Sequence, residues 1–183
     1  AKKYGAEVPF LRPQEISQDN STDLECYDHA IEWLQNNELY NPDLIIQLRP
    51  TSPLRTIVMI EEAISIMIEN KTFDSLRAVC EPDHTPYKMW RLLDDQKMEP
   101  LLNLDGNDEP YNTNRQLLPE VFVQTGSIDI TRPETIKKLR SMTGKNIYPY
   151  RIDEKYFVDI DNIESLELAE VRMKRIDCIK INK

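Results

Sequence analysis

The feature of this sequence that most constrains its fold is a strand–helix–strand unit between residues 44 and 80. The run at 44–48 (LIIQL) is short and mostly apolar, which is typical of a strand buried in a parallel sheet. Apolar residues at helical spacing follow from Thr56, and the run at 75–80 (SLRAVC) predicts a second strand. Because this order implies a right-handed crossover, the sequence predicts an α/β domain.

Apolar spacing and turn residues extend the α/β pattern along the chain. A helix is expected to begin at Thr22 or Asp23 and to end near Asn37. Residues 87–93 and 97–102 predict a hairpin, inserted into the domain as a lid or a subunit contact. The other expected elements are strands at 121–123, 127–130, 147–150, 156–160 and 178–181, and helices at 134–141 and 163–175.

Charge and composition limit the classes of partner. The 183 residues carry a net charge of −9, which argues against a nucleic acid polymer because phosphate binding needs a basic surface. A single nucleotide stays compatible, since Mg²⁺ and a few basic side chains can offset its phosphates. No apolar run approaches the ~20 residues that span a bilayer, so no membrane contact is expected. Three widely spaced cysteines without a CxxC motif are typical of a reduced, cytoplasmic protein.

The beginning of the chain has the pattern of the middle of an α/β domain. The first ten residues (AKKYGAEVPF) predict the end of a helix, a glycine break and a strand. The first residue is Ala1 and not a methionine. We therefore expect a segment to precede this sequence in the full protein.

The strongest indication of chemistry is the segment YFVDID at 156–161. Alternate side chains share one face of a strand, so Asp159 and Asp161 would lie side by side. Two neighbouring carboxylates repel each other unless a cation or a proton lies between them, which makes the pair a candidate metal site. Spacing alone leaves an alternative open, in which Asp161 caps the following helix and Asp159 is solvated.

A second candidate is the loop at 47–55 (QLRPTSPLR), directly after the first strand. Ligands of open α/β sheets bind outside the carboxyl ends of strands, where Arg49, Thr51 and Ser52 are expected. Arg49 could bind a carboxylate or a phosphate with two parallel hydrogen bonds. In the alternative, which the residues alone slightly favour, this is a strand-to-helix turn whose hydroxyls satisfy backbone groups.

Two other arginines are candidates for binding an anion. Arg115 begins the segment RQLLP at 115–119, and Arg12 lies at the end of the first expected strand. A guanidinium at either place could reach an anionic ligand. For Arg115 taken alone, a surface arginine at the end of a loop is the favoured interpretation.

Taken together, these segments resemble the CMP-sialic acid synthetase family (acylneuraminate cytidylyltransferases). Each motif is weak alone, but the set follows the family's order over nearly the whole chain. The motifs are GAEVPFLRP at 5–13, HAIEW at 29–33, PTSPLR at 50–55, PY at 86–87, RQxxP at 115–119, a turn at Gly126, and DID at 159–161 followed by AE at 169–170.

The resemblance implies a fold and a reaction. The fold would be a Rossmann-like, three-layer α/β nucleotidyltransferase with an inserted β-hairpin dimerisation module at about 84–118. The protein would be a homodimer and an enzyme of the N-acylneuraminate cytidylyltransferase type. It would join CTP to a nonulosonic (sialic-type) acid, a nine-carbon 2-keto sugar acid, giving the CMP-sugar and pyrophosphate.

The resemblance also implies roles for particular residues. Asp159 and Asp161 correspond to the family's catalytic pair, which holds Mg²⁺. Arg115 corresponds to the arginine that binds the sugar carboxylate. The arginine before proline in the nucleotide region corresponds to Arg12, with Asn20 nearby.

Three departures from the family pattern bear on the substrate and on activity. Arg49 stands where the family usually has a sugar-site glutamine, and TGSID at 125–129 replaces Asn-Gly-Ala-x-Tyr, whose tyrosine faces the sugar. The substrate could therefore be legionaminic or pseudaminic acid instead of N-acetylneuraminic acid. The Arg-x-Gly-Ser-Lys-Gly loop that grips the CTP phosphates is absent, so 1–183 would be a single domain that lacks its N-terminal nucleotide-binding unit and is inactive alone.

Two other functions stay open on the sequence. One is a non-catalytic sugar-nucleotide-binding or dimerisation module that has lost the phosphate loop. The other is a cytidylyltransferase for another 2-keto sugar acid, such as 3-deoxy-manno-octulosonate. A strand followed by Arg-x-Gly-Ser-Lys-Gly upstream of Ala1 would favour the enzyme over the module.

Overall fold

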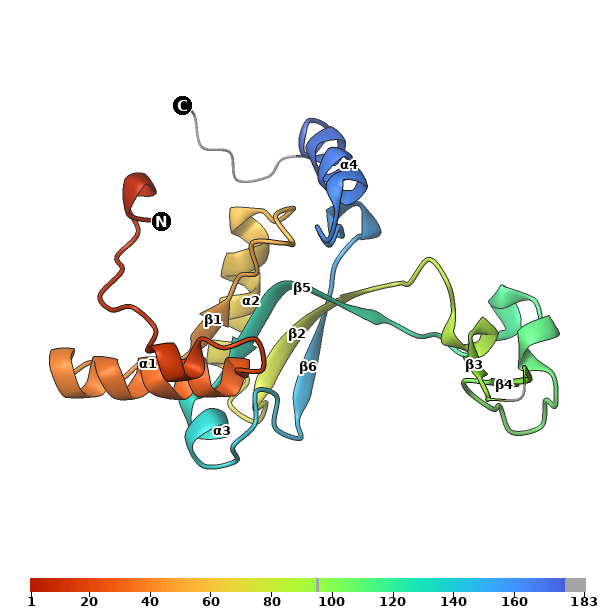
Figure 1. Ribbon diagram of the computed structural model, residues 1–183, viewed down its shortest axis with the longest axis horizontal. Coiled ribbons are helices and arrows are strands. Elements are labelled where there is room, and N and C mark those ends of the chain that lie inside the picture. Colours follow the sequence, from red (N-terminus) through yellow and green to blue (C-terminus); the bar gives the residue numbers. More distant parts are fainter. Residues whose placement is uncertain (95, 177–183) are drawn as a thin grey trace. The chain divides into compact units, whose positions relative to one another are not determined.

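The computed structural model of the chain describes residues 1–94 and 96–176 (Figure 1). The chain forms two compact units, each assembled from separate stretches of sequence. The first unit comprises 1–48, 57–77 and 128–149; the second comprises 49–56, 78–127 and the chain from Tyr150 onward. The strand predicted at 178–181 lies outside the described residues.

A four-stranded mixed sheet forms the centre of the fold. Its order is β1-β5-β2-β6, from β1 (Ile45–Gln47), β5 (Val123–Thr131), β2 (Ser75–Cys80) and β6 (Ile147–Arg151) (Figure 1). β5 pairs with β1 in antiparallel orientation, with Ile46 opposite Ile130. β5 therefore separates β1 and β2, the two strands of the predicted strand–helix–strand unit. The predicted α/β class is confirmed, and the sheet is compatible with a Rossmann-like fold.

The first unit contains helices that the sequence predicts. α1 (Asp23–Glu38) is capped by Thr22, whose side chain accepts from the Glu25 backbone while the Glu25 carboxylate accepts from the Thr22 backbone. α2 (Ile57–Glu69) buries residues four apart, which is the spacing of one helix face. These buried residues are Met59, Ala63 and Met67. The short helices η1 (Lys2–Tyr4), η2 (Gln14–Ile16) and α3 (Pro133–Lys137) complete the unit.

The second unit contains the predicted hairpin and the last helix. β3 (Trp90–Leu92) pairs in antiparallel orientation with β4 (Met98–Pro100). α4 (Ile163–Met173) begins after Asn162. Within the described residues, this unit also contains the 3₁₀ helices η3 (Pro86–Lys88), η4 (Pro110–Asn112), η5 (Arg115–Leu117) and η6 (Glu154–Tyr156). Within the described ranges, no helix combines the length and the apolarity needed to cross a membrane.

Three local predictions are wrong. The strands expected at 121–123 and 127–130 are one strand, β5, because Gly126 takes a left-handed conformation (φ 65°) without ending it. The segment at 156–160 is not a strand. Its first residue, Tyr156, ends the 3₁₀ helix η6, and the Ile160 N–H bonds to the Thr51 carbonyl of a loop instead of to a neighbouring strand. No strand forms before Arg12, which lies in an irregular segment ahead of η2.

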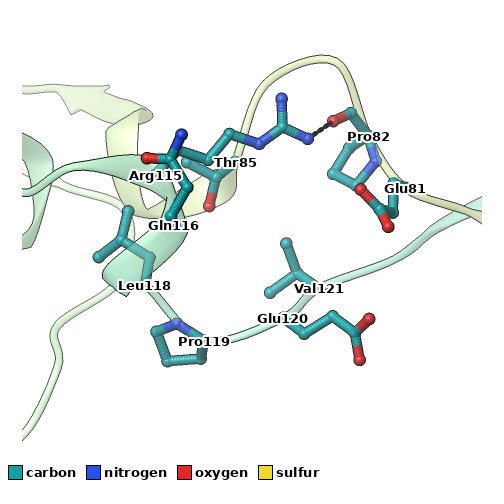
Figure 2. Close-up of a pocket in the computed structure, with 9 residues that line it drawn as sticks. All are labelled: Glu81, Pro82, Thr85, Arg115, Gln116, Leu118, Pro119, Glu120 and Val121. Carbon is teal, nitrogen blue, oxygen red and sulfur yellow. Dashed lines mark hydrogen bonds between the residues drawn. The ribbon is translucent and has the colours of Figure 1, made fainter.

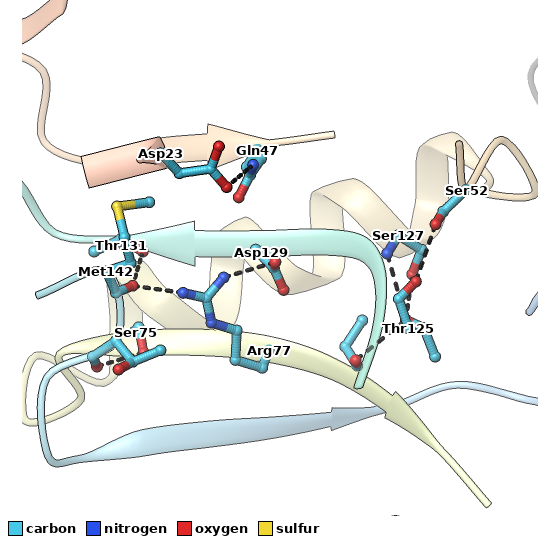
Figure 3. Close-up of polar contacts among 12 residues, drawn as sticks. Asp23, Gln47, Ser52, Ser75, Arg77, Thr125, Ser127, Asp129, Thr131 and Met142 are labelled. Atoms are coloured by element: carbon cyan, nitrogen blue, oxygen red, sulfur yellow. Dashed lines mark hydrogen bonds and ion pairs between the residues drawn. The ribbon is translucent and has the colours of Figure 1, made fainter. Parts of the chain in front are cut away.

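A buried ion pair joins β2 to β5 in the first unit. Arg77 Nη1 lies 2.6 Å from Asp129 Oδ2, and both side chains are almost fully buried (Figure 3). Arg77 Nη2 also donates to the Met142 carbonyl at 2.6 Å. Position 129 is thus occupied by a carboxylate that neutralises a buried guanidinium, whereas the family resemblance placed a sugar-facing side chain there.

We expect Asp129→Asn to destabilise the protein by about 3–5 kcal/mol, because it leaves the Arg77 charge buried without its counter-ion. Urea unfolding followed by circular dichroism measures the change. Replacing both partners, with Arg77→Met and Asp129→Leu, should recover much of the loss. The matched control is the exposed Arg91–Glu99 pair, where Glu99→Gln should cost less than about 1 kcal/mol. Equal losses at the two pairs would contradict this account.

Candidate functional site

The loop between β1 and α2 is held against β5 by buried hydrogen bonds within the second unit. Ser52 Oγ donates to the Thr125 carbonyl at 3.0 Å (Figure 3). Arg55 Nη1 donates to the Ser127 carbonyl at 2.7 Å. Arg55 Nη2 also donates to the Arg49 carbonyl. Ser52 is only 2% exposed, so its hydroxyl satisfies the backbone, as the structural alternative predicted, and is not available to a ligand.

Arg49 is positioned by Gly126. A Cβ atom added to this glycine would lie 2.9 Å from Arg49 Cδ, closer than real side-chain contacts allow. The glycine is also in the left-handed region, which favours a residue without a Cβ. Because position 126 has no side chain, the aliphatic part of the Arg49 side chain can lie against β5 at this glycine.

The Asp159–Asp161 segment is anchored to this same loop. The Ile160 N–H donates to the Thr51 carbonyl at 2.8 Å. Val158 is buried in an apolar cluster with Leu54 and Ala169, and Ile160 packs against that cluster. The alternate residues Asp159 and Asp161 are exposed. This alternation places the two carboxylates away from the apolar cluster, and their role as a metal-binding pair stays a prediction.

The capping alternative for Asp161 is wrong. The N-cap of α4 is Asn162, whose Oδ1 accepts from the Ser165 N–H at 2.9 Å. The Ser165 hydroxyl in turn accepts from the backbone N–H groups of Asp161 and Asn162. The Asp161 carboxylate is therefore not needed to begin the helix.

The pair is compatible with Mg²⁺ without forming a complete protein site. Among the described residues, no three or more His, Cys, Asp or Glu side chains form a group that could hold a metal ion. Mg²⁺ prefers oxygen ligands and is commonly held by one or two carboxylates together with water and substrate phosphates. Two exposed carboxylates on one side of a chain fit that pattern.

Arg115 lies in a pocket of about 330 Å³ within the second unit (Figure 2). Its Nη2 donates to the Pro82 carbonyl at 2.7 Å, and its Nη1 donates to the Asp83 carbonyl at 3.2 Å. The guanidinium has five N–H donors, so these two bonds do not use all of them. The nine residues that line the pocket are Glu81, Pro82, Thr85, Arg115, Gln116, Leu118, Pro119, Glu120 and Val121.

The two predicted nucleotide-binding residues belong to the first unit. Arg12 is exposed, and its Nε donates to Ser17 Oγ at 3.1 Å. Asn20 is exposed in a turn before α1. Their role in binding a nucleotide stays a prediction.

Sequence reasoning did not select three polar residues of the Arg115 pocket. Glu81 and Glu120 bring acceptors to the pocket, and Thr85 brings a buried hydroxyl (Figure 2). Glu120 lies next to the RQLLP segment and could have been considered for that reason. Glu81 and Thr85 come from the segment after β2, about thirty residues earlier, and no motif links them to Arg115.

Three curated proteins show what the chain is similar to. It is 26% identical over 176 residues to the post-translational flagellin modification protein B of Campylobacter coli, covering 95% of this chain and 71% of that protein. It is 27% identical to the N-acylneuraminate cytidylyltransferase of Escherichia coli O18:K1:H7, covering 92% of this chain and 38% of that protein. It is 23% identical to the pseudaminic acid cytidylyltransferase of Campylobacter jejuni, covering 95% of this chain and 72% of that protein. No protein-family model matches the chain.

These relatives confirm the resemblance to the CMP-sialic acid synthetase family. The resemblance implies a nucleotidyltransferase. The relatives named as cytidylyltransferases belong to this enzyme class. More particularly, the relatives include both N-acylneuraminate and pseudaminic acid enzymes, so the similarity spans more than one sugar acid.

We expect Gly126→Ala to destabilise the protein by about 1–2 kcal/mol, through backbone strain and through contact with Arg49. Urea unfolding measures the loss. Arg49→Ala removes the contact but not the strain, so the double variant should be more stable than the sum of the single effects predicts. Additive effects would show that the glycine does not position Arg49.

Proposed function

We propose that the protein is a cytidylyltransferase that activates a nonulosonic acid with CTP, giving the CMP-sugar and pyrophosphate. The observation that carries the proposal is the Ile160–Thr51 backbone bond, which holds the Asp159–Asp161 segment against the loop of Arg49. A carboxylate pair beside a fixed arginine suits a substrate with both phosphate and carboxylate groups. Similarity to cytidylyltransferases over 92–95% of the chain supports this reaction over other phosphate chemistry.

Asp159 and Asp161 would be the residues that hold Mg²⁺. The ion, when bound, would offset negative charge on the triphosphate. The protein's contribution is to keep both carboxylates exposed while Val158 and Ile160 anchor the segment to the apolar cluster. An anchored backbone loses less conformational freedom when the pair binds the ion, which favours affinity.

The reaction itself requires mainly positioning of the two substrates. The anomeric hydroxyl of the acid attacks the α-phosphorus of CTP, a new P–O bond forms, and the bond to pyrophosphate breaks. We assign no general base for the hydroxyl proton. Arg115, in the pocket, would bind the sugar carboxylate, and Arg49 would contact the sugar from the neighbouring loop. Both guanidiniums orient the acid without entering the chemical step.

The identity of the acid belongs to the same proposal. A nine-carbon 2-keto acid of the sialic type is favoured by the N-acylneuraminate and pseudaminic acid relatives. Arg49, in place of the family's glutamine, favours an acid other than N-acetylneuraminic acid. Arg12 and Asn20 would bind the nucleotide on the strength of the resemblance alone. A CTP-dependent reaction and the free cysteines Cys26 and Cys80 accord with the cytoplasm.

The test is pyrophosphate release by the full-length protein, including any segment that precedes Ala1. We expect release from CTP and Mg²⁺ with at least one of N-acetylneuraminic, legionaminic and pseudaminic acid. Asp161→Asn should lower kcat by about 100-fold or more, because a metal-bearing carboxylate loses its charge. Its thermal unfolding should stay unchanged, since Asn162 caps α4.

Asp43→Asn is the matched control, because it makes the same substitution at another exposed carboxylate, in the turn before β1. Its rate should equal that of the wild type. No turnover with any of the three acids would refute the proposed reaction and favour a non-catalytic module. Full activity of Asp161→Asn would remove the metal role from the pair.

We also propose that the protein forms a homodimer through the module at about 84–118. The support from the described residues is apolar exposure: Leu92 is 80% exposed on β3, and Met98 is 54% exposed on β4. Other exposed apolar side chains of this segment are Met89, Trp90, Leu93, Leu101, Leu102 and Leu117. Grouped exposed apolar side chains are characteristic of interaction surfaces.

Leu92→Lys should shift the protein from dimer to monomer, because it introduces a charge into the proposed apolar contact. Light scattering coupled to size-exclusion chromatography measures the mass. Leu39→Lys is the control, since Leu39 is 86% exposed at the end of α1, outside the module. A monomeric wild-type protein, or a dimer that survives Leu92→Lys, would count against this interface.

A further inference from the structure

Thr85 is placed to cap a helix but does not do so. A threonine that precedes a helix commonly accepts a hydrogen bond from a backbone N–H of the first turn. Thr85 precedes η3, and its carbonyl accepts from the Lys88 N–H at 3.0 Å. Its side chain makes no capping hydrogen bond. The hydroxyl is therefore not used by the helix that it precedes.

The Thr85 hydroxyl is also buried without a partner. The residue is 5% exposed, and Oγ1 has no hydrogen-bond partner within residues 1–94 and 96–176. Most buried polar side-chain atoms in folded proteins are hydrogen-bonded, because an unpaired one has lost its water without a replacement. An unpaired hydroxyl at a pocket wall can be paired by a group that enters the pocket.

The pocket that Thr85 lines is the one that contains Arg115. Figure 2 shows the Thr85 oxygen turned toward the interior of the pocket, on the side of Leu118 and Val121. The pocket's 330 Å³ lies within the size range of small-molecule sites. Its wall combines a cation, Arg115, with two carboxylates, Glu81 and Glu120. A ligand that fits all of these groups carries a carboxylate together with O–H or N–H donors.

We propose that Thr85 is a substrate-binding residue, which hydrogen-bonds a hydroxyl or acetamido group of the sugar acid whose carboxylate Arg115 binds. A threonine hydroxyl both donates and accepts, so it suits these neutral groups. A site built to hydrogen-bond a substrate group discriminates against analogues that lack it. Thr85 thereby contributes to the choice of sugar. The identity of the ligand rests on the proposed function.

The test compares Thr85→Val, which removes the hydroxyl at nearly constant shape, with Thr85→Ser, which keeps it. Isothermal titration of the full-length protein with N-acetylneuraminic acid and with pseudaminic acid measures binding directly. For the acid that binds the wild type, we expect Thr85→Val to weaken affinity about 3- to 10-fold and Thr85→Ser to stay within about 2-fold. The KM for CTP should not change.

Thermal unfolding separates a binding role from a structural one. Because Oγ1 has no partner in the described chain, Thr85→Val should unfold at the wild-type temperature or slightly above it. A lower unfolding temperature of Thr85→Val, rescued by Thr85→Ser, would show a structural hydroxyl and overturn the proposal. Equal affinities of wild type and Thr85→Val would also overturn it, as would a wild type that binds neither acid.

Pyrophosphate release, measured in parallel, distinguishes this inference from the proposed function. Turnover with affinity independent of Thr85 would refute the role of Thr85 and leave the reaction standing. Affinity that depends on Thr85 without turnover would support the binding role and count against the reaction.

Discussion

The burial of polar side chains along β5 is the constraint on which the rest of the structure depends. Thr125, Ser127, Asp129 and Thr131 are each at most 2% exposed, although they occupy a strand inside a sheet. Buried hydroxyls and carboxylates must find partners, and their partners come from other elements. Asp129 pairs with an arginine of β2, and Thr131 Oγ1 donates to the Met142 carbonyl at 2.8 Å. β5 is therefore joined to neighbouring elements by side-chain ion pairs and hydrogen bonds as well as by backbone pairing.

The candidate site follows from this constraint by short steps. Ser52 and Arg55 bind carbonyls of β5 and so hold the loop that carries Arg49. The Thr51 carbonyl of that loop then accepts from Ile160, which aligns the aspartate pair. The segments that carry an arginine and two carboxylates are thus held within one unit by hydrogen bonds from neighbouring residues. Fixing the segments that carry charged groups is what a preorganised binding site requires.

Elements with strong local signals could be predicted from the sequence. β2 and α2 follow from apolar runs and helical spacing, and α1 follows from its Thr22–Glu25 capping box. The segment at 156–160 could not be predicted, because a strand needs a partner strand along its length. Within the described residues, the Ile160 N–H bonds to the Thr51 carbonyl of a loop instead. Thr85 could not be selected either, since its importance lies in burial and a missing partner, which no local pattern encodes.

The sequence by itself determined the α/β class and most helices and strands. It also contained the aspartate pair and the family resemblance from which the proposed roles of the arginines come. The tertiary structure decided what these residues contact. The physical reason is range: capping and apolar periodicity act over a few residues, whereas the bond between Ser52 and Thr125 joins positions 73 apart. Only the folded chain shows that Asp129 neutralises a buried arginine. It also shows that Asn162, and not Asp161, caps α4, and that Thr85 and Arg115 line the same pocket.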